Sequence, residues 1–146
     1  MIFDERTEFC DATSAILAIG NAIIGDVVDL GATPTLRNTG NGEPIYLVLQ
    51  VATTFVGAGA TVQFQLASDS TANLATSKTV HWDSGAIALA TLVAGYTKVV
   101  VLPSEHTYER YLGLWETVAT ADVTAGAINA FLTHDIAKWA AYTDQF

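Results

Sequence analysis

The chain has 146 residues, six Lys and Arg, 15 Asp and Glu and a net charge of −9, which fits one acidic domain that folds around its own core. Its cations are scattered singly, so it lacks the cationic cluster that nucleic-acid phosphates or anionic membrane surfaces require. Its one cysteine, Cys10, excludes an intrachain disulfide and is expected to be a small buried thiol.

Residues 1–25 differ in character from the rest of the chain. Acidic side chains crowd the first dozen positions, and the small, apolar stretch ATSAILAIGNAIIG follows at 12–25. Gly20 and Gly25 break any long helix, so this region is predicted to be an extended arm with a short strand or turn. A short helix over 12–19 is the alternative. The acidic start is unlike a signal peptide, and the apolar run is too short to cross a bilayer, so we expect a chain that stays in the cytoplasm where it is made or in an assembly formed there.

From residue 25 onward the pattern is that of β-strands. In the clearest strand, 61–69, apolar and polar side chains alternate, which is typical of a strand with one buried and one wet face. The other predicted strands lie at 25–31, 44–55, 78–85, 95–103, 109–119 and 127–136, with loops or turns at 32–44, 57–60, 69–77 and 120–126 and a loop of partial strand character at 86–95.

These seven or eight short strands, with no linker between them, predict a single all-β domain over 26–146 behind the arm at 1–25. Strands of this length and spacing are typical of a β-sandwich, a jelly roll or a barrel. In the strand at 78–85, Val80 and Trp82 are expected to face the core and His81 the solvent. The residues predicted to fill the core are Leu47, Leu49, Phe64, Leu66, Trp82, Leu114 and Phe131.

No motif in the chain predicts catalysis. The glycine-rich GAGA at 57–60 lacks the Lys-Ser/Thr and the helix of a phosphate-binding loop. The three histidines fall on separate predicted elements, and the densest polar cluster, Glu105, His106 and Glu109, is explained by an exposed loop. We therefore predict no enzymatic activity, no cofactor and no bound metal.

The composition instead favours binding to other proteins. Charged residues make up 14% of the chain, against about a quarter in ordinary domains. A small domain with so few charges is expected to cover part of its surface with a partner, and a two-fold homodimer is the commonest arrangement. The predicted partner-binding residues are apolar side chains among charges near the N-terminus and aromatic rings near the C-terminus: Ile2, Phe3, Asp4, Glu5, Arg6, Phe9, Trp139 and Tyr142.

An ordered set of segments covers nearly the whole chain: MIFDERTEFCDAT, IIGDVVDLG, TVQFQLASDST, LVAGYTKVVVLP, ERYLGLWETV and TAGAINAFLTHD. In this order they resemble the capsid cement (decoration) proteins of tailed bacteriophages, in the family typified by the cement protein of a Bordetella podophage. The resemblance implies a jelly-roll-like domain on the outer surface of an HK97-type shell in the virion. It also implies homodimers that bridge neighbouring subunits of the major capsid protein, with no enzymatic activity.

Two other functions stay open on the sequence alone. A carbohydrate-binding or adhesin-like β-sandwich module would use the aromatic side chains of the C-terminal third. A small β-barrel enzyme is the weaker possibility, because no group of residues in the chain supports a reaction.

Overall fold

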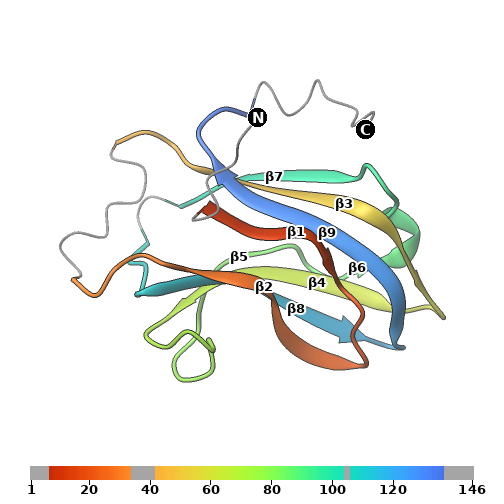
Figure 1. Ribbon diagram of the computed structural model, residues 1–146. Helices are drawn as coiled ribbons and strands as arrows, with labels where there is room; N and C mark the ends of the chain where they lie inside the picture. The colour runs from red at the N-terminus through yellow and green to blue at the C-terminus, as the bar shows by residue number, and fades with distance from the viewer. Residues whose placement is uncertain (1–6, 34–41, 104–105, 137–146) are drawn as a thin grey trace.

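A computed structural model describes residues 7–33, 42–103 and 106–136. These residues form nine β-strands and one short 3-10 turn, and no α-helix (Figure 1). The elements are β1 Glu8–Ser14, β2 Gly20–Asp29, β3 Tyr46–Gly57, β4 Thr61–Asp69, β5 Thr79–Asp83, β6 Ile87–Ala88, η3 Leu89–Thr91, β7 Thr97–Val101, β8 Tyr111–Ala119 and β9 Val123–Thr133.

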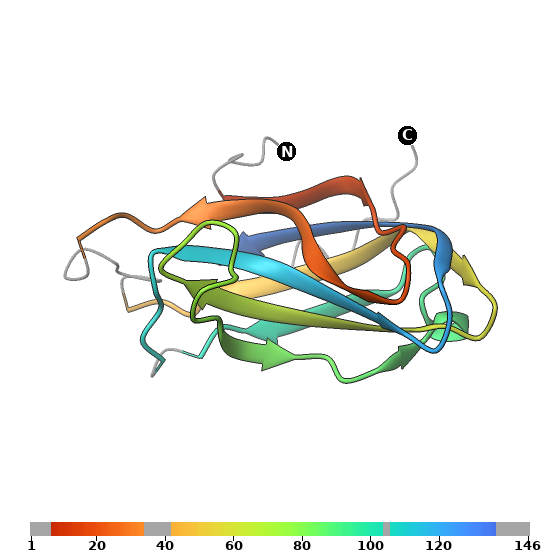
Figure 2. The ribbon, with the colours of Figure 1, turned by 90° about the horizontal axis from the view of Figure 1, so that it is seen from below.

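The strands form two antiparallel sheets packed face to face (Figures 1 and 2). One sheet has the order β1-β9-β3-β7 and the other β2-β8-β4-β5, with the short β6 also paired to β4. Thus β1 pairs with β9, β2 with β8, β3 with β7 and β4 with β5. This nesting of a long folded hairpin is the jelly-roll arrangement, so the predicted all-β sandwich is confirmed.

The extended arm predicted over residues 1–25 is wrong for its described part. β1 pairs with β9 in one sheet, and β2 pairs with β8 in the other, so both strands belong to the sandwich. Gly25 has φ of +74°, and a side chain there would collide with the carbonyl oxygen of Phe9. A glycine is therefore required where β2 passes against β1, and this close contact seals one side of the sandwich.

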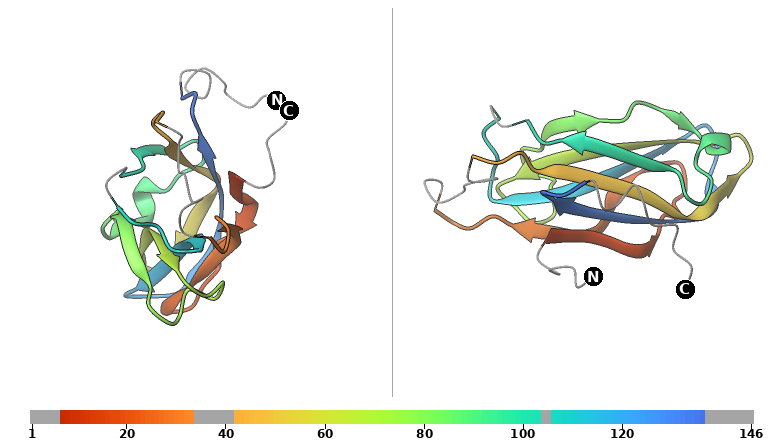
Figure 3. Two further views of the ribbon diagram at one scale, coloured as in Figure 1. Left: turned by 90° about the vertical axis from the view of Figure 1, so that its left-hand side faces the viewer. Right: turned by 90° about the horizontal axis from the view of Figure 1, so that it is seen from above.

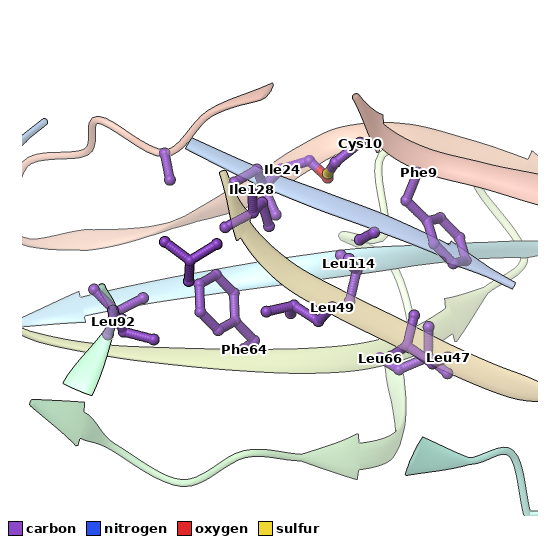
Figure 4. Packing of buried hydrophobic residues seen from close by; sticks show 14 of the residues in the cluster. Phe9, Cys10, Ile24, Leu47, Leu49, Phe64, Leu66, Leu92, Leu114 and Ile128 are labelled. Atoms are coloured by element: carbon purple, nitrogen blue, oxygen red, sulfur yellow. The ribbon is translucent and has the colours of Figure 1, made fainter. Parts of the chain in front are cut away.

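The space between the sheets is filled by large aliphatic and aromatic side chains. Phe64 and Leu66 of β4 face Leu47 and Leu49 of β3 across this interior (Figure 4), and all four are buried together with Leu114, as predicted. Phe64 also makes an edge-on ring contact with Phe55, with centroids 6.3 Å apart. The interior is thus a continuous apolar layer, as expected for two packed sheets.

Two core predictions require correction. Phe131 is buried, but its pairing with Val48 rather than Leu47 or Leu49 places it on the outer face of its sheet. Trp82 faces the interior at its rim and is half-buried.

Candidate functional site

Most of the predicted partner-binding residues lie outside the described part of the chain: Ile2, Phe3, Asp4, Glu5, Arg6, Trp139 and Tyr142. The remaining one, Phe9, is 1% exposed and points into the core from β1 (Figure 4). The prediction that Phe9 binds a partner is therefore wrong. Its burial contributes to the stability of the sandwich instead.

The two ends of the sandwich differ in chemistry. The strand connections at 15–19, 58–60, 84–96 and 120–122 all meet at one end, on the right in Figure 1 and in the right panel of Figure 3. These four connections, all within the described residues, contain one charged side chain, that of Asp122. We call them, together with Val56 at the end of β3, the apolar end.

The apolar end exposes large aliphatic side chains to solvent. Isolated exposed side chains of this kind are ordinary on a protein surface, but a gathering of them is typical of a binding site. Seven large hydrophobic side chains are exposed among the described residues, and four of these belong to the apolar end: Ile16, Ile19, Val56 and Val93.

The connections of the apolar end are fastened mainly through their own backbones. The N–H of Val123 donates to the carbonyl of Leu17 over 3.0 Å, and the N–H of Phe55 donates to the carbonyl of Leu92 over 2.9 Å. The carboxylate of Asp122 accepts the N–H of Ile19 at 2.8 Å. Because the backbone groups satisfy one another, few polar side chains are needed at this end, and the surface can remain apolar.

The opposite end, which faces the viewer in the left panel of Figure 3, is richer in charge than the apolar end, and its described charged residues are Asp29, Glu43, Asp69, Lys78, Glu109 and Arg110. It comprises the connections 30–45, 70–78 and 102–110, as far as they are described, with Asp29 and Asp69 at the strand ends. We call it the charged end. Arg110 forms a two-pronged ion pair with Asp29, with Nη2 2.8 Å from Oδ2.

Asp69 organises the 70–78 connection. Its side chain is fully buried and accepts backbone N–H groups of Thr71, Thr76 and Ser77 at 2.9–3.1 Å. Burial opposes ionisation of this carboxyl, but the hydrogen bonds outweigh burial and lower its pKa to about 2. The ionised Asp69 therefore fixes the backbone of this loop at both of its ends.

A chain of hydrogen bonds links Ser68, His81 and His106 at the charged end. Ser68 Oγ lies 2.7 Å from Nε2 of His81, and Nδ1 of His81 lies 3.2 Å from Nδ1 of His106. Ser68 Oγ also accepts the N–H of Glu109 at 3.0 Å. All these groups are satisfied if the Ser68 hydroxyl donates to His81 Nε2 and His81 Nδ1–H donates to His106. Burial, and then the neighbouring His106, lower the pKa of His81, so the folded chain disfavours its protonation.

The prediction that His81 faces the solvent is wrong, because β5 departs from a regular strand. The pairing of β4 with β5 shifts register between Leu66 and Ala67, which inserts an extra residue in β5. The bulge turns His81 inward and leaves Val80, which was expected to be buried, 38% exposed.

The Ser68–His81 pair does not form a usable nucleophile. Ser68 is fully buried, so its hydroxyl is not accessible to a substrate in solvent. Within the described residues, no three His, Cys, Asp or Glu side chains gather to hold a metal ion. The geometry of this cluster supports a structural link between β4, β5 and the 102–110 connection.

Glu116 is an acid in the apolar interior. It follows Leu112 and Leu114 on the inward face of β8 and is 3% exposed, and no described residue gives its Oε1 a hydrogen bond. Burial raises its pKa to about 7. Cys10, across the interior on β1, is buried too, and burial raises the pKa of its thiol to about 12, so it is unreactive.

The aromatic rings on the outer face of the β2-β8-β4-β5 sheet do not form an open platform. The Lys78 ammonium lies 4.0 Å from the centre of the Trp115 ring, and the Arg110 guanidinium lies 4.8 Å from that of Tyr111. A sugar stacking on either ring would have to displace the cationic side chain that covers it. This arrangement gives no support to the carbohydrate-binding alternative.

The sequence analysis missed the apolar end, although the signal was present. The apolar or small connections at 15–19, 58–60, 84–96 and 120–122 alternate along the chain with the more polar connections at 30–45, 70–78 and 102–110. In an antiparallel fold, alternate connections lie at the same end. Only the strand order shows which side chains then become neighbours.

Comparison with known proteins finds one family. The Bbp16 family model matches residues 12–132, which is most of the chain and nearly all of the sandwich. No curated protein matches the sequence. Separately, none of the described segments is a helix long and apolar enough to cross a membrane.

Proposed function

Because the chain belongs to the Bbp16 family, which bears the name of a Bordetella phage protein, we propose that it is a capsid cement (decoration) protein. It binds the outer surface of an HK97-type phage shell and bridges neighbouring subunits of the major capsid protein. The family match over residues 12–132 carries this proposal, since it covers nearly all of the sandwich and the family bears the name of a phage protein. The low charge of the chain and the exposed aliphatic side chains of the apolar end support it.

The mechanism is mechanical. Packed DNA pushes a shell outward, and a protein bound across two subunits stabilises the joined state by its binding free energy. Each contact can be modest, because many copies act on one closed lattice. No reaction, cofactor or metal takes part.

A homodimer fits this task. A two-fold dimer presents the same binding surface twice, so one dimer contacts two shell subunits. Light scattering at micromolar concentration is expected to give about twice the 15.4 kDa chain mass, and a monomer mass would argue against a dimer formed before binding.

The test of the function is binding to shells. Purified protein is mixed with expanded empty shells of the phage's own major capsid protein and sedimented, with unexpanded shells and bovine albumin as controls. We expect saturable binding to expanded shells and a higher temperature of shell disruption. If the protein stays in the supernatant at micromolar concentration, and a glycan array retains it, the carbohydrate-binding alternative replaces this proposal.

A further inference from the structure

We propose that the apolar end is the surface that docks on the shell, and that its partner there is an uncharged, apolar surface of a major capsid protein subunit. This inference rests on the proposed function and adds to it the place of contact. It leaves the charged end in solvent.

The exposed side chains of the apolar end belong to adjoining segments. Ile16 and Ile19, 60% and 62% exposed, lie on a connection bonded to the start of β9 through Leu17 and Val123. Val56, 53% exposed, belongs to the same neighbourhood, because the Thr124 hydroxyl donates to its carbonyl oxygen at 3.1 Å. The start of β9 therefore links these three aliphatic side chains.

The fourth side chain joins from the η3 connection. Val93 is 48% exposed, and the next residue, Ala94, donates its N–H to Thr54 Oγ1 at 2.9 Å. Thr54 lies two positions before Val56 on β3. The four aliphatic side chains thus gather at one end of the sandwich, where their burial by a partner removes apolar area from water.

The apolar end carries a single charge, and this indicates which kind of partner surface can bind there. The carboxylate of Asp122, its one charge, already accepts the N–H of Ile19. A charged group of a partner pressed against this surface would lose its water without gaining a counter-ion, which is costly. An uncharged, apolar partner surface has no such cost, and the net charge of −9 stays almost entirely outside the contact.

The backbone bonds of the apolar end favour docking without rearrangement. Its connections are fixed to the strands by bonds such as Phe55 N–H to Leu92 O and Ala15 N–H to Gly126 O. A surface already held in its bound shape loses little conformational entropy on binding.

The exposed aliphatic side chains outside the apolar end are poorer candidates for the docking surface. Val99 and Val101 are exposed on β7, an edge strand. Lys98, which precedes Val99, is paired in register with Leu49 and so lies on the inward side of that edge. Inward charges on edge strands are a common device against pairing with another protein. β7 therefore supplies a matched control.

The test is a charge scan with a matched control. Val56→Asp and Val101→Asp place the same carboxylate at β-strand valines that are 53% and 54% exposed. Ile19→Asp, on a connection, keeps the test informative if the strand variant folds poorly. Thermal melting of each free variant checks the fold, and sedimentation with expanded shells measures affinity.

We expect Val56→Asp and Ile19→Asp to bind at least about tenfold more weakly, and Val101→Asp to bind within about twofold of the natural chain. Equal binding by all variants, or an equal loss in Val101→Asp, overturns this inference and leaves the proposed function standing. If the natural chain itself does not bind shells, the proposed function fails.

A second copy of the chain is the competing occupant of the apolar end. If Val56→Asp converts a dimer in solution to a monomer, the apolar end is an interface between copies and the inference is overturned. An unchanged dimer together with weakened shell binding supports it.

Discussion

The apolar end and the charged end of the sandwich stabilise their connections by different means. At the charged end, side chains do this: Asp69 binds three backbone N–H groups, and Arg110 pairs with Asp29. At the apolar end, the backbones of 15–19 and 84–96 bond directly to neighbouring strands. A connection fixed by its backbone needs no polar side chains for support, which leaves its surface open to apolar residues and to a partner.

The comparison also separates stability from binding. Substitutions at the charged end are expected to change the free energy of unfolding and its pH dependence. Substitutions of exposed residues at the apolar end are expected to change the affinity for a partner. The predictions below test the first half of this division, beginning with the largest effect.

Asp69→Ala is expected to lower the free energy of unfolding by about 3 kcal/mol, because it removes charge-assisted hydrogen bonds to three backbone N–H groups. Asp122→Ala, the counterpart at the apolar end, removes one such bond at an exposed site and is expected to cost less than about 1 kcal/mol. Urea denaturation at pH 7 measures both. Equal costs would contradict the division between the ends.

The contribution of Asp69 to the free energy of unfolding depends on pH. The pKa of Asp69 is lowered from 3.8 to about 2 in the folded chain. Its contribution is therefore fully present above pH 3.8 and is lost as the pH falls toward 2. Asp69→Ala removes this part of the acid sensitivity.

Glu116→Gln is expected to raise the free energy of unfolding at pH 8 by about 2 kcal/mol. Burial raises the pKa of Glu116 from 4.5 to about 7, so folding favours the protonated acid. The contribution of Glu116 to stability is thus most favourable below pH 4.5 and is lost as the pH rises through 7. The amide of the variant has no charge to bury at any pH. At pH 4.5 folded Glu116 is also uncharged, so the difference in the free energy of unfolding between the variant and the natural chain falls below about 1 kcal/mol.

Asp26→Asn is the control for Glu116, since Asp26 is an exposed acid on the adjacent strand β2. It removes one exposed carboxylate and leaves the interior unaltered, so it measures the effect of a lost charge alone. A Glu116→Gln profile parallel to that of the natural chain would show that Glu116 is ionised in the folded state throughout.

His106→Ala is expected to have the smallest effect, under about 1 kcal/mol at pH 8, because His106 is exposed and shares one hydrogen bond with His81. The pKa of His81 is lowered, so the natural chain loses stability as the pH falls below 6.5. The variant should lose less, since the neighbour that opposes protonation of His81 is gone. Chemical denaturation at pH 8, 6.5 and 5.5 measures the difference.

The sequence predicted the fold class from the strands that keep a regular alternation. The strand predicted at 61–69 is β4 with the same bounds, and its inward residues Phe64 and Leu66 were identified. Such regularity follows from sheets that pack on one face only. The jelly-roll order itself was expected from the family resemblance.

The failures occur where strands are irregular. β1 contains two register shifts, after Glu8 and after Cys10, and β2 contains another between Ile24 and Val28. These bulges break the period of two, so residues 8–25 resembled an arm. The bulge in β5 likewise reversed the expected facing of Val80 and His81.

The candidate site could not be predicted from local pattern. Ile19, Val56 and Val93 are far apart in the chain, and only the strand order brings their connections to one end. The predicted docking residues that are described reduce to Phe9, which is needed for the core. Apolar side chains near a terminus do not by themselves distinguish docking on a partner from docking on the domain.

Radical footprinting of the free and the shell-bound protein tests the central claim most directly. Hydroxyl radicals oxidise exposed aliphatic side chains, and mass spectrometry reads the extent at each residue. The account predicts strong protection of Ile16, Ile19, Val56 and Val93 on binding, with Val101 oxidised as in the free protein. Protection confined to the charged end or to β7, with the apolar end still oxidised, would contradict it.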